Sequence, residues 1–293
     1  DLYSDVFVGR APATTTLEAE TFVDKALVYE KTPSVLFSDR NLYLAEVLFP
    51  YDWEPGDVIS SDGAGDAVEP SLAFVPPEIR TARLYQNYTA YPGSYELGRE
   101  AAIDSLETGY NIACHVGHGN KDVMRVSSGN YVSLNDVNAL SNGQERSGFV
   151  WMLNCTSTKI EADCIAERFI NNAGGGATML WGPSRFCFPT TARDYFVKWF
   201  ERFYTEDITG AGPICAASRS PFVGNSNFDN TDRWTQVSFI LLGDPETSIL
   251  TGRPKSLTVV HSQSVALGEA NVSVTVTDPA AVDSAYVCIA KDG

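Results

Sequence analysis

Residues 111–120, with the sequence NIACHVGHGN, decide the fold class of this chain. Positions 111–116 predict a short buried strand, and the glycines that follow predict a turn that presents His118 at the carboxyl end of the strand. Within the strand we expect Cys114 to pack in the core and His115 to be buried and hydrogen-bonded. Functional groups gather beyond the carboxyl ends of parallel strands, so this turn indicates an α/β protein with a site at one sheet edge.

The same arrangement recurs farther along the chain. Residues 149–153, FVWML, predict a strand that ends at Asn154-Cys155, and residues 160–173 predict a helix that Gly174 ends. Residues 177–181 predict another strand, and aromatic residues at spacings of three and four predict the core face of a helix. These aromatic residues are Tyr195, Phe196, Trp199, Phe200 and Phe203. Strands that alternate with helices favour a mostly parallel sheet with helices on both faces.

The first hundred residues fit this scheme. A capping box, Thr15 to Glu18, predicts the start of an amphipathic helix that ends near residue 30. Residues 5–9 and 42–49 predict strands, and the Pro, Gly and Asp-rich residues 51–70 predict a loop. A further helix is expected from about residue 94 to residue 106.

The pattern changes after Gly252-Arg253-Pro254. Residues 257–260, 272–276 and 286–289 alternate apolar and polar side chains with no helix between them, which predicts strands of an immunoglobulin-like β-sandwich. We therefore predict two domains, at residues 1–252 and 255–293, the second being the start of a sandwich.

Composition excludes several classes of partner. The 293 residues carry 37 acidic and 21 basic side chains, for a net charge of −16, which argues against nucleic acid and anionic membrane. No apolar run is long enough to span a bilayer. Six cysteines without C-x-x-C spacing and three histidines make a zinc site or a multi-histidine metal site unexpected.

His118 and Cys155 are 37 residues apart, which leaves room for one connection between neighbouring strands. An imidazole beside a thiol can take its proton and later return it to a leaving amine. The backbone N–H groups of Gly119 and Cys155 could then hold the oxyanion of a tetrahedral intermediate. The residues alone leave open a plainer reading, in which the cysteine packs in the core and the histidine is solvated.

Five ordered blocks resemble the gingipain-like cysteine peptidases, whose catalytic fold is caspase-like. The blocks are Tyr3 to Arg10, Val116-Gly117-His118-Gly119-Asn120, Leu153-Asn154-Cys155, Cys164-Ile165-Ala166-Glu167 and Leu241-Leu242-Gly243-Asp244-Pro245. The resemblance covers nearly the whole chain and includes the β-rich tail. It implies a cysteine endopeptidase with Cys155 as nucleophile and His118 as acid-base.

The resemblance also implies a carboxylate that orients the histidine, and Glu46 occupies the comparable place. An acid on Nδ1 would fix the tautomer and stabilise the imidazolium, although a solvated glutamate remains the alternative. Cys164 is expected to pack, and Cys187 and Cys215 could pair with each other.

Well-known members of the family cleave after arginine or lysine by means of an aspartate in the first specificity pocket. Asp57, Asp62 and Asp66 are the candidates for that aspartate, and Trp181 with Phe186 could instead form an apolar pocket. Chemistry needs no cofactor, and the acidic loop at residues 57–66 could supply oxygen ligands to a structural calcium ion.

The resemblance further implies a secreted or surface-anchored bacterial protein that acts on protein or peptide substrates. A preceding α/β subdomain or a pro-segment is an expected partner, because the family's catalytic domain usually has another subdomain before the block at Tyr3. The alternative function is a surface or adhesion protein that keeps the peptidase fold without catalysis.

Overall fold

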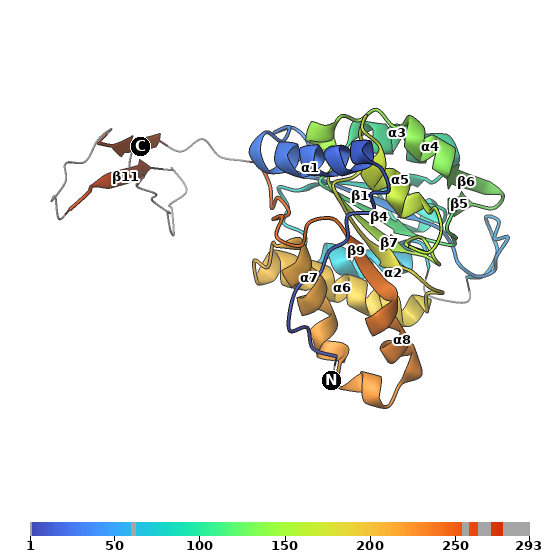
Figure 1. Cartoon of the computed structure of the whole chain (residues 1–293). Coiled ribbons are helices and arrows are strands. Elements are labelled where there is room, and N and C mark those ends of the chain that lie inside the picture. Colours follow the sequence, from blue (N-terminus) through green and yellow to red (C-terminus); the bar gives the residue numbers. More distant parts are fainter. Residues whose placement is uncertain (1, 60–62, 254–257, 263–270, 278–293) are drawn as a thin grey trace. The chain divides into compact units, whose positions relative to one another are not determined.

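Seven strands form one central sheet in the order β3-β2-β1-β4-β7-β8-β9 (Figure 1). Their bounds are Arg40–Ala45 for β1, Arg80–Tyr85 for β2, Tyr95–Glu96 for β3, Ile112–Val116 for β4, Phe149–Leu153 for β7, Met179–Pro183 for β8 and Phe239–Leu242 for β9. All neighbours are parallel except β8 and β9. The predicted mostly parallel sheet is confirmed, with an antiparallel strand at one edge.

This computed structural model describes residues 2–59, 63–253, 258–262 and 271–277. The chain divides into two units, at residues 1–253 and 254–293. In the second unit, β10 (Thr258–His261) pairs antiparallel with β11 (Val274–Thr277). The third strand expected there, at residues 286–289, lies outside the described residues, so the immunoglobulin-like sandwich stays a prediction.

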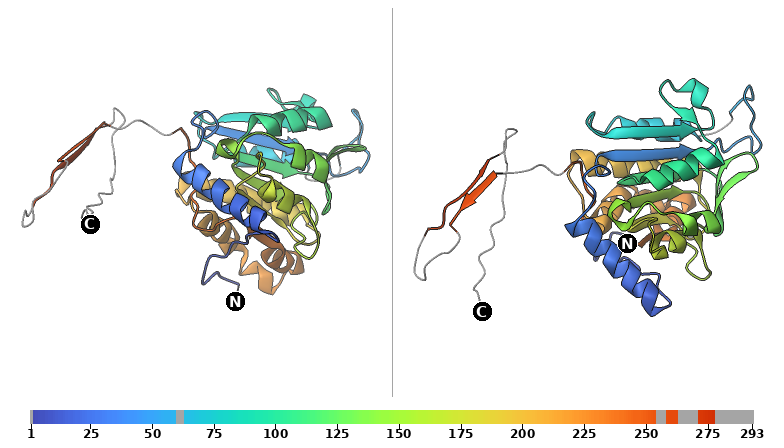
Figure 2. Two further views of the ribbon diagram at one scale, coloured as in Figure 1. Left: turned by 45° about the horizontal axis from the view of Figure 1, so that its top comes forward. Right: turned by 90° about the horizontal axis from the view of Figure 1, so that it is seen from above.

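Helices cover both faces of the sheet (Figures 1 and 2). One layer holds α1 (Thr16–Lys31), α3 (Arg99–Thr108), α4 (Leu134–Ala139) and α5 (Ile165–Asn171), and the other holds α2 (Gly65–Leu72), α6 (Pro189–Thr205), α7 (Ala211–Arg219) and α8 (Asn230–Ser238). Side chains alternate across the strands, so Cys114 and Trp151 face the aromatic core beneath α6 whereas Ala113 and Met152 face the core beneath α5. Among the described residues, none of the helices is long and apolar enough to cross a membrane.

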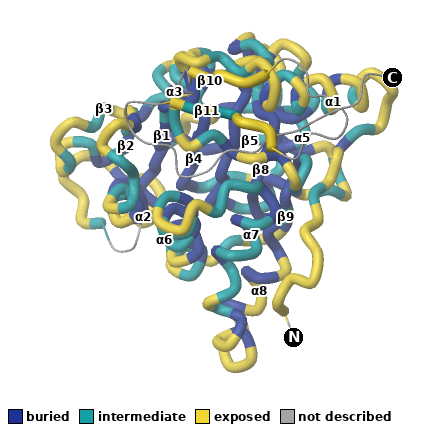
Figure 3. The backbone as a smooth tube through the Cα atoms, turned by 90° about the vertical axis from the view of Figure 1, so that its left-hand side faces the viewer, coloured by how far each residue is buried: buried dark blue, intermediate teal, exposed yellow. Residues whose placement is uncertain are grey.

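The aromatic stripe of α6 is buried as predicted, and its side chains fill one of the two cores. The ring of Trp199 stacks on Phe149 of β7 with 5.1 Å between centroids, and Phe196 meets Trp151 edge to face. Figure 3 shows the inner strands of the central sheet, such as β4 and β8, buried, with exposed loops and turns around the sheet. The capping box of α1 is also confirmed, since the Thr15 hydroxyl accepts a hydrogen bond from the Glu18 N–H.

Three local predictions were wrong. The strand predicted at residues 42–49 ends at Ala45, because the Val47 N–H donates to the side chain of Gln86 instead of the strand ladder. Helix α2 begins inside the predicted loop and runs past its end, because the burial of Ala67 and Val68 outweighs the composition of the segment, including Pro70. Residues 5–9 form no strand, and only Arg10 makes a bridge to β9.

Candidate active site

Three parallel strands deliver the candidate residues to one edge of the sheet. Val116 of β4 pairs with Ala45 of β1 on one side and with Leu153 of β7 on the other. The ladder continues one step further, because the Glu46 N–H donates to the Val116 carbonyl (2.8 Å) and the Gly117 N–H to the Leu153 carbonyl (3.1 Å).

His118 and Cys155 each lie two residues beyond the paired positions of adjacent strands. Adjacent strands are about 4.8 Å apart, so residues at equal displacement emerge side by side. The two turns are in close contact: a Cβ atom at Gly119 would lie 2.9 Å from the Asn154 amide nitrogen. A Cβ atom there would also lie 2.9 Å from the Val123 carbonyl oxygen, so a side chain at position 119 would force the backbone apart. The glycine thus allows the histidine turn to lie against the residue before Cys155.

The imidazole of His118 is held by backbone and by aromatic rings. Its Nε2 lies 2.9 Å from the Leu48 carbonyl oxygen, which can only accept, so Nε2 carries the hydrogen and Nδ1 is the free base. The rings of Phe49 and Tyr51 flank the imidazole at centroid distances of 5.8 and 4.9 Å. Burial lowers the pKa of His118, and the positive charge of Arg125 lowers it further, against the opposing effect of the Leu48 carbonyl.

Glu46 contacts His118 in a different way from the one expected. The carboxylate is buried, and its Oε2 accepts the backbone N–H of His118 at 2.8 Å, whereas the ring nitrogen Nε2 bonds to the Leu48 carbonyl. A carboxylate at the end of β1 lies level with Gly117, so it reaches the backbone of the turn. Glu46 therefore holds the backbone of the histidine turn, whereas the carbonyl of Leu48 determines which ring nitrogen of His118 carries the hydrogen.

Glu46 is paired with a residue that sequence reasoning missed. Arg125 of β5 (Val123–Ser127), which forms a hairpin with β6 (Asn130–Ser133), places its Nε 2.7 Å from Glu46 Oε1. Burial raises the pKa of Glu46 to about 7, while the His118 N–H and Arg125 oppose that rise. An isolated arginine within the apolar run Val123-Met124-Arg125-Val126 was the available signal, since a buried charge requires a partner.

His115 is buried and hydrogen-bonded, as predicted. Its Nε2 donates to the Arg125 carbonyl at 2.7 Å, so its Nδ1 accepts from the Asn154 amide at 3.2 Å. The ring therefore joins β5 to the residue before Cys155. Burial, the largest cause, lowers the pKa of His115 to about 4.

This shift predicts a pH dependence of stability. Because the folded protein holds His115 neutral down to about pH 4 whereas the unfolded chain protonates near 6.5, folding loses stability as the pH falls through that window. The loss amounts to about 3 kcal/mol and is absent above the window. Urea unfolding of wild type and His115→Gln at several pH values should show a difference that shrinks toward pH 4; the exposed His261→Gln serves as control. A constant difference would contradict this assignment.

Cys155 is half-buried at the turn after β7, and its Sγ accepts the Cys187 N–H at 3.5 Å. Thr156, directly after it, has a left-handed backbone (φ 53°) and donates its N–H to the Arg185 carbonyl at 3.0 Å. The other described cysteines are Cys114, Cys164, Cys187 and Cys215, all free thiols whose pKa burial raises. Cys187 and Cys215 are therefore not paired, and Cys114 and Cys164 pack as predicted.

The N–H of Gly119 suits the oxyanion role that the sequence suggested. Gly119 forms a bridge with Met124 in which the hydrogen bonds are made by the neighbouring residues, from Asn120 N–H to the Val123 carbonyl and from Arg125 N–H to the His118 carbonyl. The bridge thus leaves the N–H of Gly119 itself available.

The candidate specificity residues do not converge. Asp57 accepts the Glu54 N–H at 3.0 Å, Asp66 accepts the Tyr91 hydroxyl at the start of α2, and Asp62 lies outside the described residues. Trp181 is 1 % exposed and packs against Trp151 and Phe239 in the core, because its position is mid-strand and not at the strand end. Phe186 is exposed beyond that strand end.

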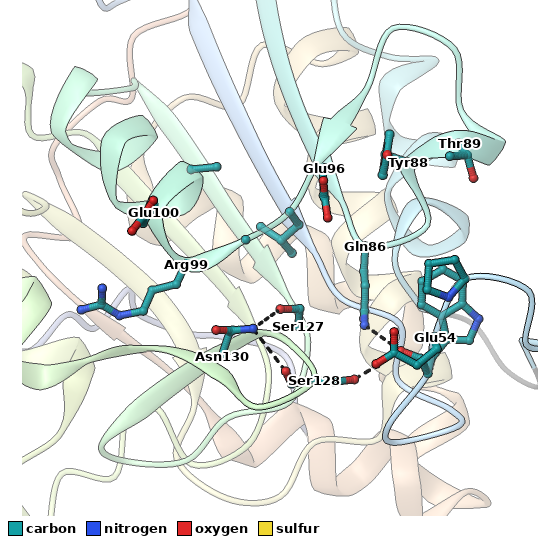
Figure 4. Close-up of a pocket in the computed structure, with 15 residues that line it drawn as sticks. Glu54, Gln86, Tyr88, Thr89, Glu96, Arg99, Glu100, Ser127, Ser128 and Asn130 are labelled. Atoms are coloured by element: carbon teal, nitrogen blue, oxygen red, sulfur yellow. Dashed lines mark hydrogen bonds between the residues drawn. The ribbon is translucent and has the colours of Figure 1, made fainter.

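An acidic pocket of about 630 Å³ opens at the same sheet edge, beyond β1 and β2 (Figure 4). Three glutamates, Glu54, Glu96 and Glu100, and one arginine, Arg99, line it, and the Gln86 side chain in its wall donates to the Trp53 carbonyl. Ser128 of the β5–β6 hairpin donates to the same carbonyl. Within the described ranges, no cluster of histidine, cysteine and carboxylate side chains could hold a metal ion.

Comparisons with known proteins agree with this architecture. The sequence profile of peptidase family C25 matches residues 1–250. A complex of the pro- and mature domains of Porphyromonas gingivalis RgpB has a TM-score of 0.74 at 15 % identity, covering 94 % of this chain and 64 % of that one. A search of curated proteins found no match.

Two further solved structures have the same fold. The Arg-specific cysteine proteinase gingipain R gives a TM-score of 0.72 at 15 % identity, and a structure described as a protease gives 0.71 at 17 % identity. Each comparison covers 94 % of this chain and 63 % of the other chain, so this chain spans less than two thirds of their length. The fold is the caspase-like fold of the gingipains, and with the profile matched over residues 1–250 this chain belongs to peptidase family C25.

Proposed function

We propose that this protein is a cysteine endopeptidase in which Cys155 is the nucleophile and His118 the acid-base. The observation that carries the proposal is the placement of both residues at equal distance beyond adjacent parallel strands, with the Gly119 turn against Asn154. Among the described cysteines, Cys155 is the one that directly follows β7 beside the histidine turn; Cys187 lies next to it, and burial raises the thiol pKa of Cys187 and of the other three.

In the proposed mechanism, Nδ1 of His118 takes the thiol proton while Nε2–H stays on the Leu48 carbonyl. The thiolate attacks the peptide carbonyl, and the N–H groups of Gly119 and Cys155 hold the oxyanion. The imidazolium gives its proton to the leaving amine, which releases the first product and leaves an acyl-enzyme. Water, deprotonated by His118, then releases the second product.

The proposed substrates are peptides and proteins that carry basic residues at or near the cleaved bond. The net charge of −16 and the acidic pocket at the site edge support this preference. We further propose secretion or display at the cell surface, and a pro-segment or a preceding subdomain as partner. Calcium, if bound, would be structural, and its expected loop includes Asp62, which lies outside the described residues.

The test is covalent labelling with two peptidyl chloromethyl ketones, one ending in arginine and one in leucine. We expect mass spectrometry to place one adduct per chain on Cys155, with faster labelling by the arginine compound. Cys187→Ser is the matched control and should label as wild type does. Equal labelling of several cysteines, or none in the folded protein, would favour a surface protein that only keeps the fold.

A further inference from the structure

Arg125 contacts Glu46, the Tyr51 segment and the backbone of His118, although it lies outside the proposed proton path. Its side chain is 1 % exposed and carries a charge into the base of the site. Burying a charge is unfavourable unless well-placed partners compensate for the lost hydration. The contacts of the guanidinium therefore show what its burial at this site stabilises. The inference below rests on the proposed function.

The first contact is with Glu46. Arg125 Nε lies 2.7 Å from Glu46 Oε1, and the other oxygen of the same carboxylate accepts the His118 N–H at 2.8 Å. The guanidinium therefore holds the carboxylate in the orientation that fixes the backbone of the histidine turn.

The second contact is with the segment that covers the imidazole. Arg125 Nη2 donates to the Tyr51 carbonyl at 2.6 Å and to Asp52 Oδ1 at 3.2 Å. The guanidinium carbon lies 3.6 Å from the centre of the Tyr51 ring, and that ring packs against His118. The Tyr51 ring thus contacts both the guanidinium of Arg125 and the imidazole of His118. Tyr51 is three residues after Leu48, whose carbonyl accepts Nε2–H of His118.

The third contact is through the backbone of Arg125. Its N–H donates to the His118 carbonyl at 2.9 Å, and its carbonyl accepts Nε2–H of His115 at 2.7 Å. Since His115 bonds to Asn154 beside Cys155, one residue is linked to both turns of the site.

We propose that Arg125 is a positioning residue, which locks the Glu46 carboxylate and the Tyr51 segment around His118 and so sets the direction of Nδ1 and its readiness to accept a proton. A planar guanidinium can engage a carboxylate, a carbonyl and an aromatic face together, whereas a lysine ammonium cannot reproduce that set. Among the described residues, the charged and titratable groups around His118 are Arg125, Glu46, His115 and Tyr51, with Asp52 on Arg125 and with Cys155 as the proposed partner. Of these, Arg125 carries the positive charge that lowers the pKa of His118.

The experiment measures kcat, KM and the pH profile of kcat/KM for three variants. We expect Arg125→Lys to lower kcat about tenfold with KM little changed, and to keep the acid limb of the profile. Arg125→Met should lower kcat further and move the acid limb to higher pH, because His118 loses a nearby positive charge and protonates more easily. Tyr51→Leu, on an exposed residue, should lower kcat without moving that limb.

Arg83→Lys is the control, since Arg83 forms a 2.7 Å pair with Glu69 away from His118, and it should keep wild-type kinetics. A role limited to folding would lower the melting temperature of the Arg125 variants while the surviving enzyme kept wild-type kcat and acid limb. That result would overturn the inference. If the Arg125 variants do not fold, unchanged kinetics in Tyr51→Leu would overturn it instead. An inactive wild-type protein would instead refute the proposed function.

Discussion

A Cys155→Ala variant is expected to lose peptide hydrolysis altogether while keeping the melting temperature of the wild type. Removal of a catalytic nucleophile costs on the order of 10⁴-fold or more, because no other group forms the acyl-enzyme. Cys155 is half-buried and its Sγ accepts one long contact from Cys187, so the loss of the sulfur should change folding little. The measurement is cleavage of a fluorogenic peptide together with a thermal melt.

Cys187→Ala is the matched control, because this thiol is adjacent to Cys155 and burial raises its pKa. It should retain hydrolysis within a few-fold of the wild type. Residual hydrolysis by Cys155→Ala that survives further purification would contradict the assignment of the nucleophile.

Replacement of His118 with alanine is expected to lower kcat/KM by about 10²- to 10⁴-fold, the usual contribution of a general acid-base group. The thiol loses its proton acceptor and the leaving amine loses its donor. His261→Ala is the matched control, since His261 is exposed in the second unit, and it should keep wild-type kinetics.

The pH profile of the surviving activity separates the possible roles of His118. If the imidazole is the base, the acid limb of kcat/KM should disappear in His118→Ala. A variant with the wild-type profile and a small loss of rate would mean that His118 only packs between Phe49 and Tyr51.

The repeated pattern of apolar run and polar turn was enough to predict the sheet. The strand at residues 149–153 was predicted with its observed bounds, because five consecutive buried residues followed by Asn154-Cys155 leave little choice. The helix of residues 65–72 was missed, because its glycine and proline favour a loop locally and only burial against the sheet and α6 stabilises it. The β5–β6 hairpin was missed because its strands are only five and four residues long and their short apolar stretches are flanked by polar residues, which gives a weak signal.

The site was predictable in part for a related reason. His118 and Cys155 could be placed at one edge because residues that follow neighbouring parallel strands by the same number of positions emerge at the same edge of the sheet. The carbonyl of Leu48 could not be foreseen, since every residue has a carbonyl and only the folded backbone shows which one meets Nε2. The contact of the Cys187 N–H could not be foreseen for the same reason, whereas the apolar residues on either side of Arg125 indicated a buried arginine.

The most direct measurement is a crystal structure of the protein after reaction with an arginine chloromethyl ketone peptide. We expect Cys155 Sγ to have displaced chloride and to be bonded to the methylene carbon of the inhibitor, with Nδ1 of His118 facing the site and Nε2 on the Leu48 carbonyl. We also expect the ketone oxygen of the inhibitor within about 2.7–3.1 Å of the backbone nitrogens of Gly119 and Cys155. An adduct on another cysteine, or an imidazole turned away from the bound peptide, would contradict this expectation.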